Sequence, residues 1–216
     1  MTSRLGLRLL ALALPTALLL PAGAHAATLT VEDGAGDAKA LNLALVLGEM
    51  FDGTTPPDEQ VFLDAPAETT ADVVRTTIDH AEKRLTLTVQ FRDLVDTAGH
   101  SVEFRIFTPD GKWVLYAGMA GDRARAELSP SRFTETYRLC RTVRARYDLA
   151  ADTLTASVPT SCIESPKWVQ VAAGVTREKV TPQGDGSVNL AGYVDDAFRG
   201  GVSLESLGRS PKVRRG

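Results

Sequence analysis

The sequence is poor in the residues that most enzyme active sites need. Its 216 residues include three histidines, two cysteines and 6% aromatic residues. Beyond the N-terminal segment the only histidines are His80 and His100, and no G-x-S-x-G, H-E-x-x-H or P-loop motif accompanies them. We expect both to be exposed loop residues, and we expect the protein not to be an enzyme. A secreted carboxylate-dependent hydrolase stays an alternative, because a glycosidase needs only two carboxylates.

The chain also lacks an excess of basic charge. The formal net charge of the chain is −3. Binding to nucleic acid requires a dense basic face, because the phosphate backbone dominates affinity. We therefore expect no nucleic-acid partner.

Long hydrophobic runs are absent except at the N-terminus. There an apolar stretch, Leu9 to Leu20, follows Arg4 and Arg8 and precedes Ala24-His25-Ala26. A positive start, a short apolar segment and an A-x-A site are typical of a secretory signal peptide, and the apolar stretch is too short to span a bilayer. We predict a signal peptide at residues 1–26 and a secreted, extracellular protein without a membrane span. An N-terminal membrane anchor is the alternative.

The two cysteines are Cys140 and Cys162. An even number of cysteines in an exported protein predicts one disulfide, the alternative being two separate thiols. Pairing the apolar face of residues 137–147 with that of residues 153–158 puts Tyr147 opposite Leu154. Pro159 cannot donate to the ladder, so the strand should leave its register there and could bring the cysteines together.

Alternation with a period of two dominates the rest of the chain. Residues 85–91 place Leu, Leu, Val and Phe at odd positions, and residues 102–118 have the same pattern around a Pro-Asp-Gly turn. Further strands are expected at 28–31, 41–47, 137–147, 153–158 and 168–175; a helix is the alternative at 41–47, because Leu and Ala also favour helices. The pattern predicts an all-β fold: an antiparallel β-sandwich or jelly roll with long loops and few short helices.

The domain organisation follows from these elements. Residues 27–198 form one β-sandwich domain, interrupted by a long loop at 52–72 with a brief strand at 61–63. Residues 120–133 read as a charged connection. Residues 199–216 are rich in Gly, Ser and Arg, which predicts a flexible basic tail. We expect the protein to be a monomer.

One sequence pattern suggests a metal site. Asp33-Gly34-Ala35-Gly36-Asp37 follows the first strand, and Asp195-Asp196 lie near the other end of the domain. Carboxylates on a Gly-rich turn can bind a hard cation, and the two ends of a domain often lie close together. We interpret the pattern first as an ordinary Asp/Gly turn and expect no cofactor; the alternative is a structural calcium site formed by Asp33, Asp37 and Asp195 or Asp196.

Three residues are candidates for ligand binding. Trp168 and Gln170 share one face of their strand, and Tyr116 lies in another strand. Exposed aromatic rings can stack on sugars while polar groups nearby bind the hydroxyls. A lone Trp packed beneath a loop is the alternative. The basic tail could in turn hold the protein against an anionic cell-wall polymer, or simply be a frayed end.

Three segments carry a resemblance. Residues 71–89, the early Asp33-x-x-Gly36-Asp37, and residues 158–162 followed by 168–171 resemble uncharacterised secreted actinobacterial β-sandwich proteins. Those are distantly similar to DOMON and family-9 carbohydrate-binding domains, and the resemblance covers about half of the mature chain. It implies a sandwich fold and the binding of an extracellular glycan or cell-envelope component. A protein-interaction or structural module of the cell envelope is the alternative.

Overall fold

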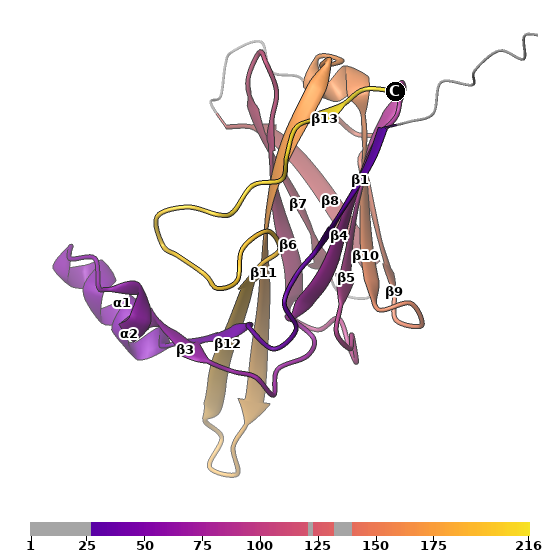
Figure 1. Cartoon of the computed structure of the whole chain (residues 1–216). Coiled ribbons are helices and arrows are strands. Elements are labelled where there is room, and N and C mark those ends of the chain that lie inside the picture. Colours follow the sequence, from indigo (N-terminus) through magenta and orange to yellow (C-terminus); the bar gives the residue numbers. More distant parts are fainter. Residues whose placement is uncertain (1–26, 121–122, 132–139) are drawn as a thin grey trace, which may run out of the picture.

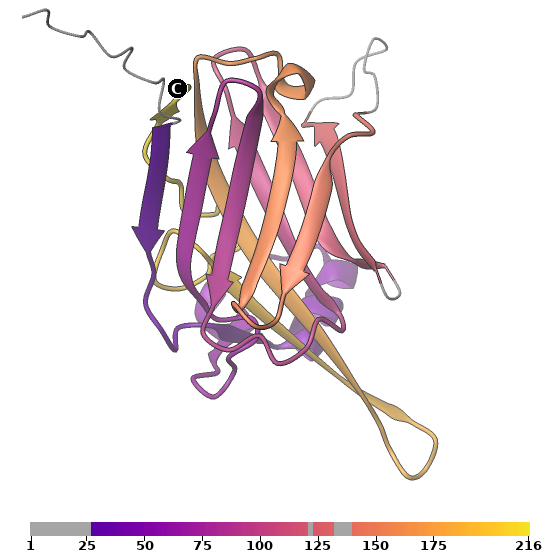
Figure 2. The same cartoon turned by 90° about the vertical axis from the view of Figure 1, so that its right-hand side faces the viewer.

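The protein is an all-β sandwich of two antiparallel sheets, as expected. The computed structural model describes residues 27–120, 123–131 and 140–216. One sheet has the strand order β1-β4-β5-β10-β9, and the other has the order β3-β2-β12-β11-β6-β7-β8 (Figures 1 and 2). The strands are β1 (Ala27–Glu32), β2 (Lys39–Leu41), β3 (Phe62–Asp64), β4 (Val73–His80), β5 (Arg84–Phe91), β6 (His100–Phe107), β7 (Lys112–Ala120), β8 (Arg123–Pro130), β9 (Arg144–Asp148), β10 (Thr153–Pro159), β11 (Trp168–Pro182), β12 (Val188–Asp196) and β13 (Val213–Arg214). The helices are α1 (Leu43–Asp52), α2 (Asp58–Val61) and a 3-10 helix (Thr160–Ile163).

The core is formed by the alternating residues of both sheets. In β5 every second side chain, from Leu85 to Phe91, is buried, and in β6 Val102, Phe104 and Ile106 are buried as well. These inward faces pack against each other, because each side chain removed from water contributes roughly 1.5–3 kcal/mol. The two strands with the clearest alternation in the sequence therefore lie at the centre of the fold.

The expected strand at 41–47 was wrong for most of its length. Only Lys39–Leu41 is a strand, and α1 begins at Leu43. The side chain of Asn42 explains the change, since its Oδ1 accepts a hydrogen bond from the backbone N–H of Leu45 at 3.3 Å. This is a helix N-cap, and the Leu and Ala residues that follow it favour a helix.

The charged connection expected at 120–133 was also wrong, because residues 123–130 form β8. Leu115 of β7 lies opposite Leu128 of β8, and Ala117 lies opposite Ala126. Arg and Glu alternate with Ala along this strand. Since Ala has a low strand propensity, the period of two was present in the sequence but weak.

The disulfide is confirmed: Cys140 and Cys162 are bonded, with their Cα atoms 5.9 Å apart. The predicted register is confirmed too, because Tyr147 lies opposite Leu154. The strand expected at 137–147 is shorter than predicted. It begins at Arg144, residues 141–142 form a turn, and residues 132–139 lie outside the described part of the chain.

Residues 199–216 were expected to be a flexible tail, whereas in the structure they run along the second sheet (Figure 1), and Val213 is buried in the core. Strand β12 ends opposite Gly174, so the first part of β11 has no neighbour on that side. The tail takes this place: the N–H of Ser210 donates to the carbonyl of Val171, and the N–H of Arg215 donates to the carbonyl of Lys167. Backbone pairing of an otherwise open edge thus holds a segment of low hydrophobicity.

The far halves of β11 and β12 project beyond the sandwich as a long hairpin (Figure 2). Residues 178–190 are all exposed. In the part of the chain that the structure describes, neither α-helix has the length and hydrophobicity required to cross a bilayer. The predicted signal peptide, residues 1–26, lies outside the described residues.

Candidate functional site

The three residues predicted to bind ligand do not form one surface. The C-terminal segment covers two of them, since Lys212 Nζ lies 4.0 Å from the centre of the Trp168 ring and Gln170 Nε2 donates to the carbonyl of Ser210 at 2.8 Å. Tyr116 is 51% exposed on β7. Tyr116 lies opposite Glu103 of β6, and Glu103 lies opposite Gly174 of β11. Gly174 is four residues along β11 from Gln170.

Both histidines were expected to be exposed, and both are buried. His100 Nε2 lies 3.2 Å from the carbonyl of Thr70, and its Nδ1 lies 3.0 Å from the hydroxyl of Tyr147. Since a carbonyl only accepts, Nε2 carries the proton and Nδ1 is the acceptor. Burial lowers the pKa of His100 to about 4, so the ring is neutral. It is a core residue whose partners come from distant segments.

A buried ion-pair network closes the same end of the sandwich. Arg177 of β11 donates to Glu68 Oε1 at 2.8 Å and to Asp96 Oδ2 at 3.0 Å. The same oxygen of Glu68 accepts the backbone N–H groups of Thr70 and Ala71. Because Arg177, Glu68 and Asp96 are bound to one another, we interpret this network as structural.

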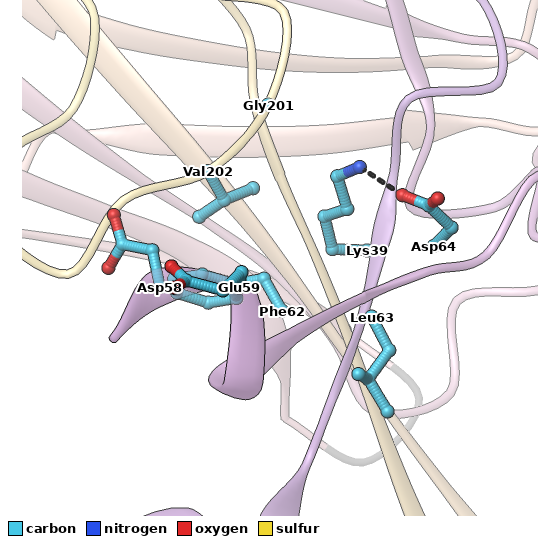
Figure 3. Close-up of a pocket in the computed structure, with 8 residues that line it drawn as sticks. All are labelled: Lys39, Asp58, Glu59, Phe62, Leu63, Asp64, Gly201 and Val202. Atoms are coloured by element: carbon cyan, nitrogen blue, oxygen red, sulfur yellow. Dashed lines mark hydrogen bonds and ion pairs between the residues drawn. The ribbon is translucent and has the colours of Figure 1, made fainter. Parts of the chain in front are cut away.

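An open pocket of about 420 Å³ lies between the 58–64 segment and the C-terminal segment (Figure 3). Its lining combines one aromatic ring, three carboxylates and one ammonium group with two residues of the C-terminal segment. These residues are Phe62, Asp58, Glu59, Asp64, Lys39, Leu63, Gly201 and Val202. No pattern in the sequence indicated this pocket, because most of its walls belong to a predicted loop and a predicted flexible tail.

Two carboxylates of the pocket are held in their charged form. The hydrogen bond and charge of Lys39 lower the pKa of Asp64. Hydrogen bonds from the backbone N–H of Leu204 and from Ser203 lower the pKa of Asp58. Both groups are therefore suited to accept hydrogen bonds from a ligand and not to donate a proton.

A second site, here called the acidic cluster, consists of Asp33, Asp37 and Asp195. One oxygen of each lies within 4.8 Å of the others. These are three of the four residues that the sequence suggested for calcium. Asp195 points toward the first sheet, where its Oδ2 accepts the N–H of Val73 at 2.7 Å. The fourth candidate, Asp196, points to the opposite face of β12.

The oxygens of Asp196 are already occupied by the C-terminal segment. Its Oδ1 accepts the N–H of Phe198, and its Oδ2 accepts the N–H of Gly208 and an ion pair from Arg199. Successive residues of a strand face opposite sides. The structure therefore brings Asp195 into the acidic cluster and places Asp196 beneath the tail.

The acidic cluster is electrostatically unusual. Burial raises the pKa of Asp195 to about 8 and that of Asp33 to about 7, and the neighbouring carboxylates add to both shifts. Burial also raises the pKa of Asp37, although the nearby amide of Gly201 offsets part of the rise. None of these three residues lines the pocket of Figure 3.

No protein-family model, curated protein or solved structure matches this chain. Its function is therefore inferred from the pocket and the acidic cluster.

Proposed function

We propose that the chain is a secreted, non-catalytic β-sandwich that binds an extracellular glycan or another hydroxyl-rich component of the cell envelope. The observation that carries this proposal is the lining of the pocket, where Phe62 lies near Asp58 and Glu59 on one side and Asp64, paired with Lys39, stands on the other (Figure 3). The apolar face of a sugar stacks on an aromatic ring, and charged oxygens accept hydrogen bonds from its hydroxyls. The volume of about 420 Å³ is within the range of small-molecule sites.

The charge state of the pocket supports binding without catalysis. A glycosidase needs one carboxylic acid whose pKa is raised, so that it is protonated when the bond breaks. Asp58 and Asp64 have lowered pKa values instead. The carboxylates with raised pKa values do not line this pocket; they are Asp33, Asp37, Asp72, Asp195 and Asp196.

The test is a binding screen of residues 27–216 against polysaccharides and isolated cell-wall material. We expect binding that Phe62→Ala weakens at least tenfold. Tyr116→Ala is the matched control, because Tyr116 is an exposed ring on β7, outside the pocket. Glu59→Gln serves as a second pocket variant that leaves the packing of Phe62 intact. The proposal would be refuted if no preparation were bound. It would also be refuted if Phe62→Ala and Glu59→Gln bound as tightly as the unmodified chain.

One observation favours the alternative of a protein-interaction module. On the projecting hairpin Val180 lies opposite Leu190 and Pro182 lies opposite Val188, so all four side chains share one exposed face. Exposed apolar residues gathered on one face are typical of interaction sites. Binding to envelope material that survives Phe62→Ala but is lost in Val180→Ser/Leu190→Ser would favour this alternative. Release of reducing sugar ends would favour the hydrolase.

A further inference from the structure

Three segments that are far apart in the sequence meet at the acidic cluster. Asp33 and Asp37 lie on the turn between β1 and β2, where Gly36 has a φ of +88°. Asp195 lies near the end of β12, and Asp72 directly precedes β4. The turn is fixed to β4 because the N–H of Gly36 donates to Asp72 Oδ2 at 2.8 Å. The fold therefore brings together the carboxyl groups of Asp33, Asp37 and Asp195 and fixes Asp72 beside the turn that carries two of them.

The oxygens of this turn are buried without sufficient donors. Among the described residues, Asp33 Oδ2 and both carboxylate oxygens of Asp37 have no hydrogen-bond partner and no contact with solvent. A buried, unpaired carboxylate is costly, and native structures pair such groups or place a metal ion beside them.

Asp72 provides an independent indication. Its side chain is 0% exposed and faces the turn that carries Asp33 and Asp37. Its Oδ2 is satisfied by Gly36 and Arg92, whereas its Oδ1 is buried and has no partner among the described residues. An oxygen of this kind needs a cation or a donor that the neighbouring chain does not supply.

The basic side chains that act on these carboxylates do not neutralise the acidic cluster. Lys39 and Arg199 are already in ion pairs with carboxylates that take no part in the site, Asp64 and Asp196, and Arg92 is paired with Asp72. A net negative charge therefore remains on Asp33, Asp37 and Asp195 when they are ionised.

We propose that Asp33, Asp37 and Asp195 bind a calcium ion, with Asp72 Oδ1 as a further oxygen ligand. Calcium takes six to eight oxygen ligands in a flexible geometry, whereas zinc and copper select nitrogen and sulfur ligands, which this group does not contain. The hydrogen bonds from Val73 and Asp196 to the Asp195 carboxylate fix its orientation. Each of its oxygens keeps a second lone pair for the ion.

The same ion would hold the C-terminal segment. Asp37 Oδ2 would lie 3.7 Å from a Cβ built on Gly200, and the amide of Gly201 is close enough to lower the pKa of Asp37. When these carboxyl groups are ionised and no calcium is bound, we expect their mutual repulsion to loosen this contact. Calcium binding should therefore slow hydrogen exchange in residues 199–208 as well as in residues 33–37.

The experiment uses residues 27–216 freed of metal with a chelator. Calorimetric titration with CaCl₂ should give one bound ion per chain, and Tb³⁺ should bind in competition with it. At a hundredfold excess over Kd, calcium should raise Tm by roughly 5–10 °C. Asp37→Asn should abolish both responses while remaining folded, because it removes one of the repelling charges. Its own Tm in chelator should be equal to or higher than that of the unmodified chain.

Asp185→Asn is the matched control, since Asp185 also lies in a Gly-rich turn but is exposed at the tip of the hairpin. It should bind calcium like the unmodified chain. The proposal is overturned if calcium gives neither heat nor a Tm shift, if Mg²⁺ reproduces the full effect at equal concentration, or if Asp37→Asn binds normally. These outcomes are separate from the glycan screen, because Phe62 is not part of the acidic cluster.

Discussion

Gly99 lies directly against the main chain of Glu178. A Cβ built on Gly99 would stand 2.1 Å from the carbonyl oxygen of Glu178, and the N–H of Glu178 donates to the carbonyl of Gly99 at 2.8 Å. Gly99 also has a φ of +63°, a conformation that L side chains rarely adopt. This contact fixes the start of β6 against β11 at the point where the long hairpin leaves the sandwich.

Gly99→Ala should therefore destabilise the protein. The new methyl group cannot be accommodated without moving one of the two backbones, which should lower the free energy of unfolding by roughly 2–4 kcal/mol. Urea unfolding followed by circular dichroism measures the change. Gly111→Ala is the control, because no atom lies within 4 Å of its Cβ position. Similar unfolding curves for the two variants would contradict the structure at this contact.

The disulfide should contribute substantially to stability. Cys140 and Cys162 are 22 residues apart in the sequence. Closing a loop of this length restricts the unfolded chain and should stabilise the fold by about 3 kcal/mol in the chain-entropy model. We expect reduction with dithiothreitol to lower Tm, and the double variant Cys140→Ser/Cys162→Ser to show the lower Tm without further change on reduction. A continued response of the double variant to the reductant would mean that another effect is being measured.

His100 should make stability depend on pH in a defined window. Burial lowers its pKa from 6.5 to about 4, so between these values the unfolded chain binds more protons than the folded one. Stability is then complete above pH 6.5 and falls as the pH is lowered toward 4, by up to about 3 kcal/mol. His100→Gln keeps a donor for the carbonyl of Thr70 but cannot be protonated.

The comparison of unfolding free energies between pH 4 and 7 should therefore give a smaller loss at low pH for His100→Gln than for the unmodified chain. The difference between the two proteins is the quantity to measure, because His80 and the buried carboxylates titrate in both of them. Tyr147→Phe keeps the imidazole and should retain the original slope. An unchanged slope in His100→Gln would show that His100 is not the group responsible.

Ser210 should anchor the C-terminal segment. Its hydroxyl oxygen accepts the N–H of Val171 at 3.0 Å, and the residue is 1% exposed. Ser210→Ala leaves that N–H buried and unpaired, which should cost roughly 1–3 kcal/mol. Hydrogen exchange at Val171 should become faster. Ser206→Ala provides a control, since Ser206 is exposed and contributes its backbone carbonyl to Arg199.

The central strands could be predicted well because the alternation of apolar and polar residues along them shows directly which side chains are buried. Leu85–Phe91 alternates without interruption, and each apolar residue is in the core. Arg123–Pro130 has the same period, but its inward residues include two alanines, which mark a strand weakly. The C-terminal segment left no such signal, since part of its attachment to β11 consists of backbone hydrogen bonds, which are independent of side-chain identity.

The candidate sites differ in the same way. Asp33 and Asp37 could be recognised because a Gly-rich turn with two carboxylates is a local pattern, and Asp195 because chain ends tend to meet. Asp72 carried no local signal, as its role depends on a contact with Gly36. The pocket around Phe62 could not be foreseen, because one of its walls is the segment that composition predicted to be flexible.

Ala27 and Gly216 are both neighbours of His80. Ala27 lies opposite His80 in the pairing of β1 with β4, and the N–H of Gly216 donates to the carbonyl of His80 at 3.0 Å. A few added residues could therefore join these positions covalently. A circular permutant reopened at the exposed Gly184–Gly186 turn would contain every strand of the parent, but its strands would be synthesised in a different order. A comparison of its folding with that of the parent would show whether the sheets close in the order of synthesis.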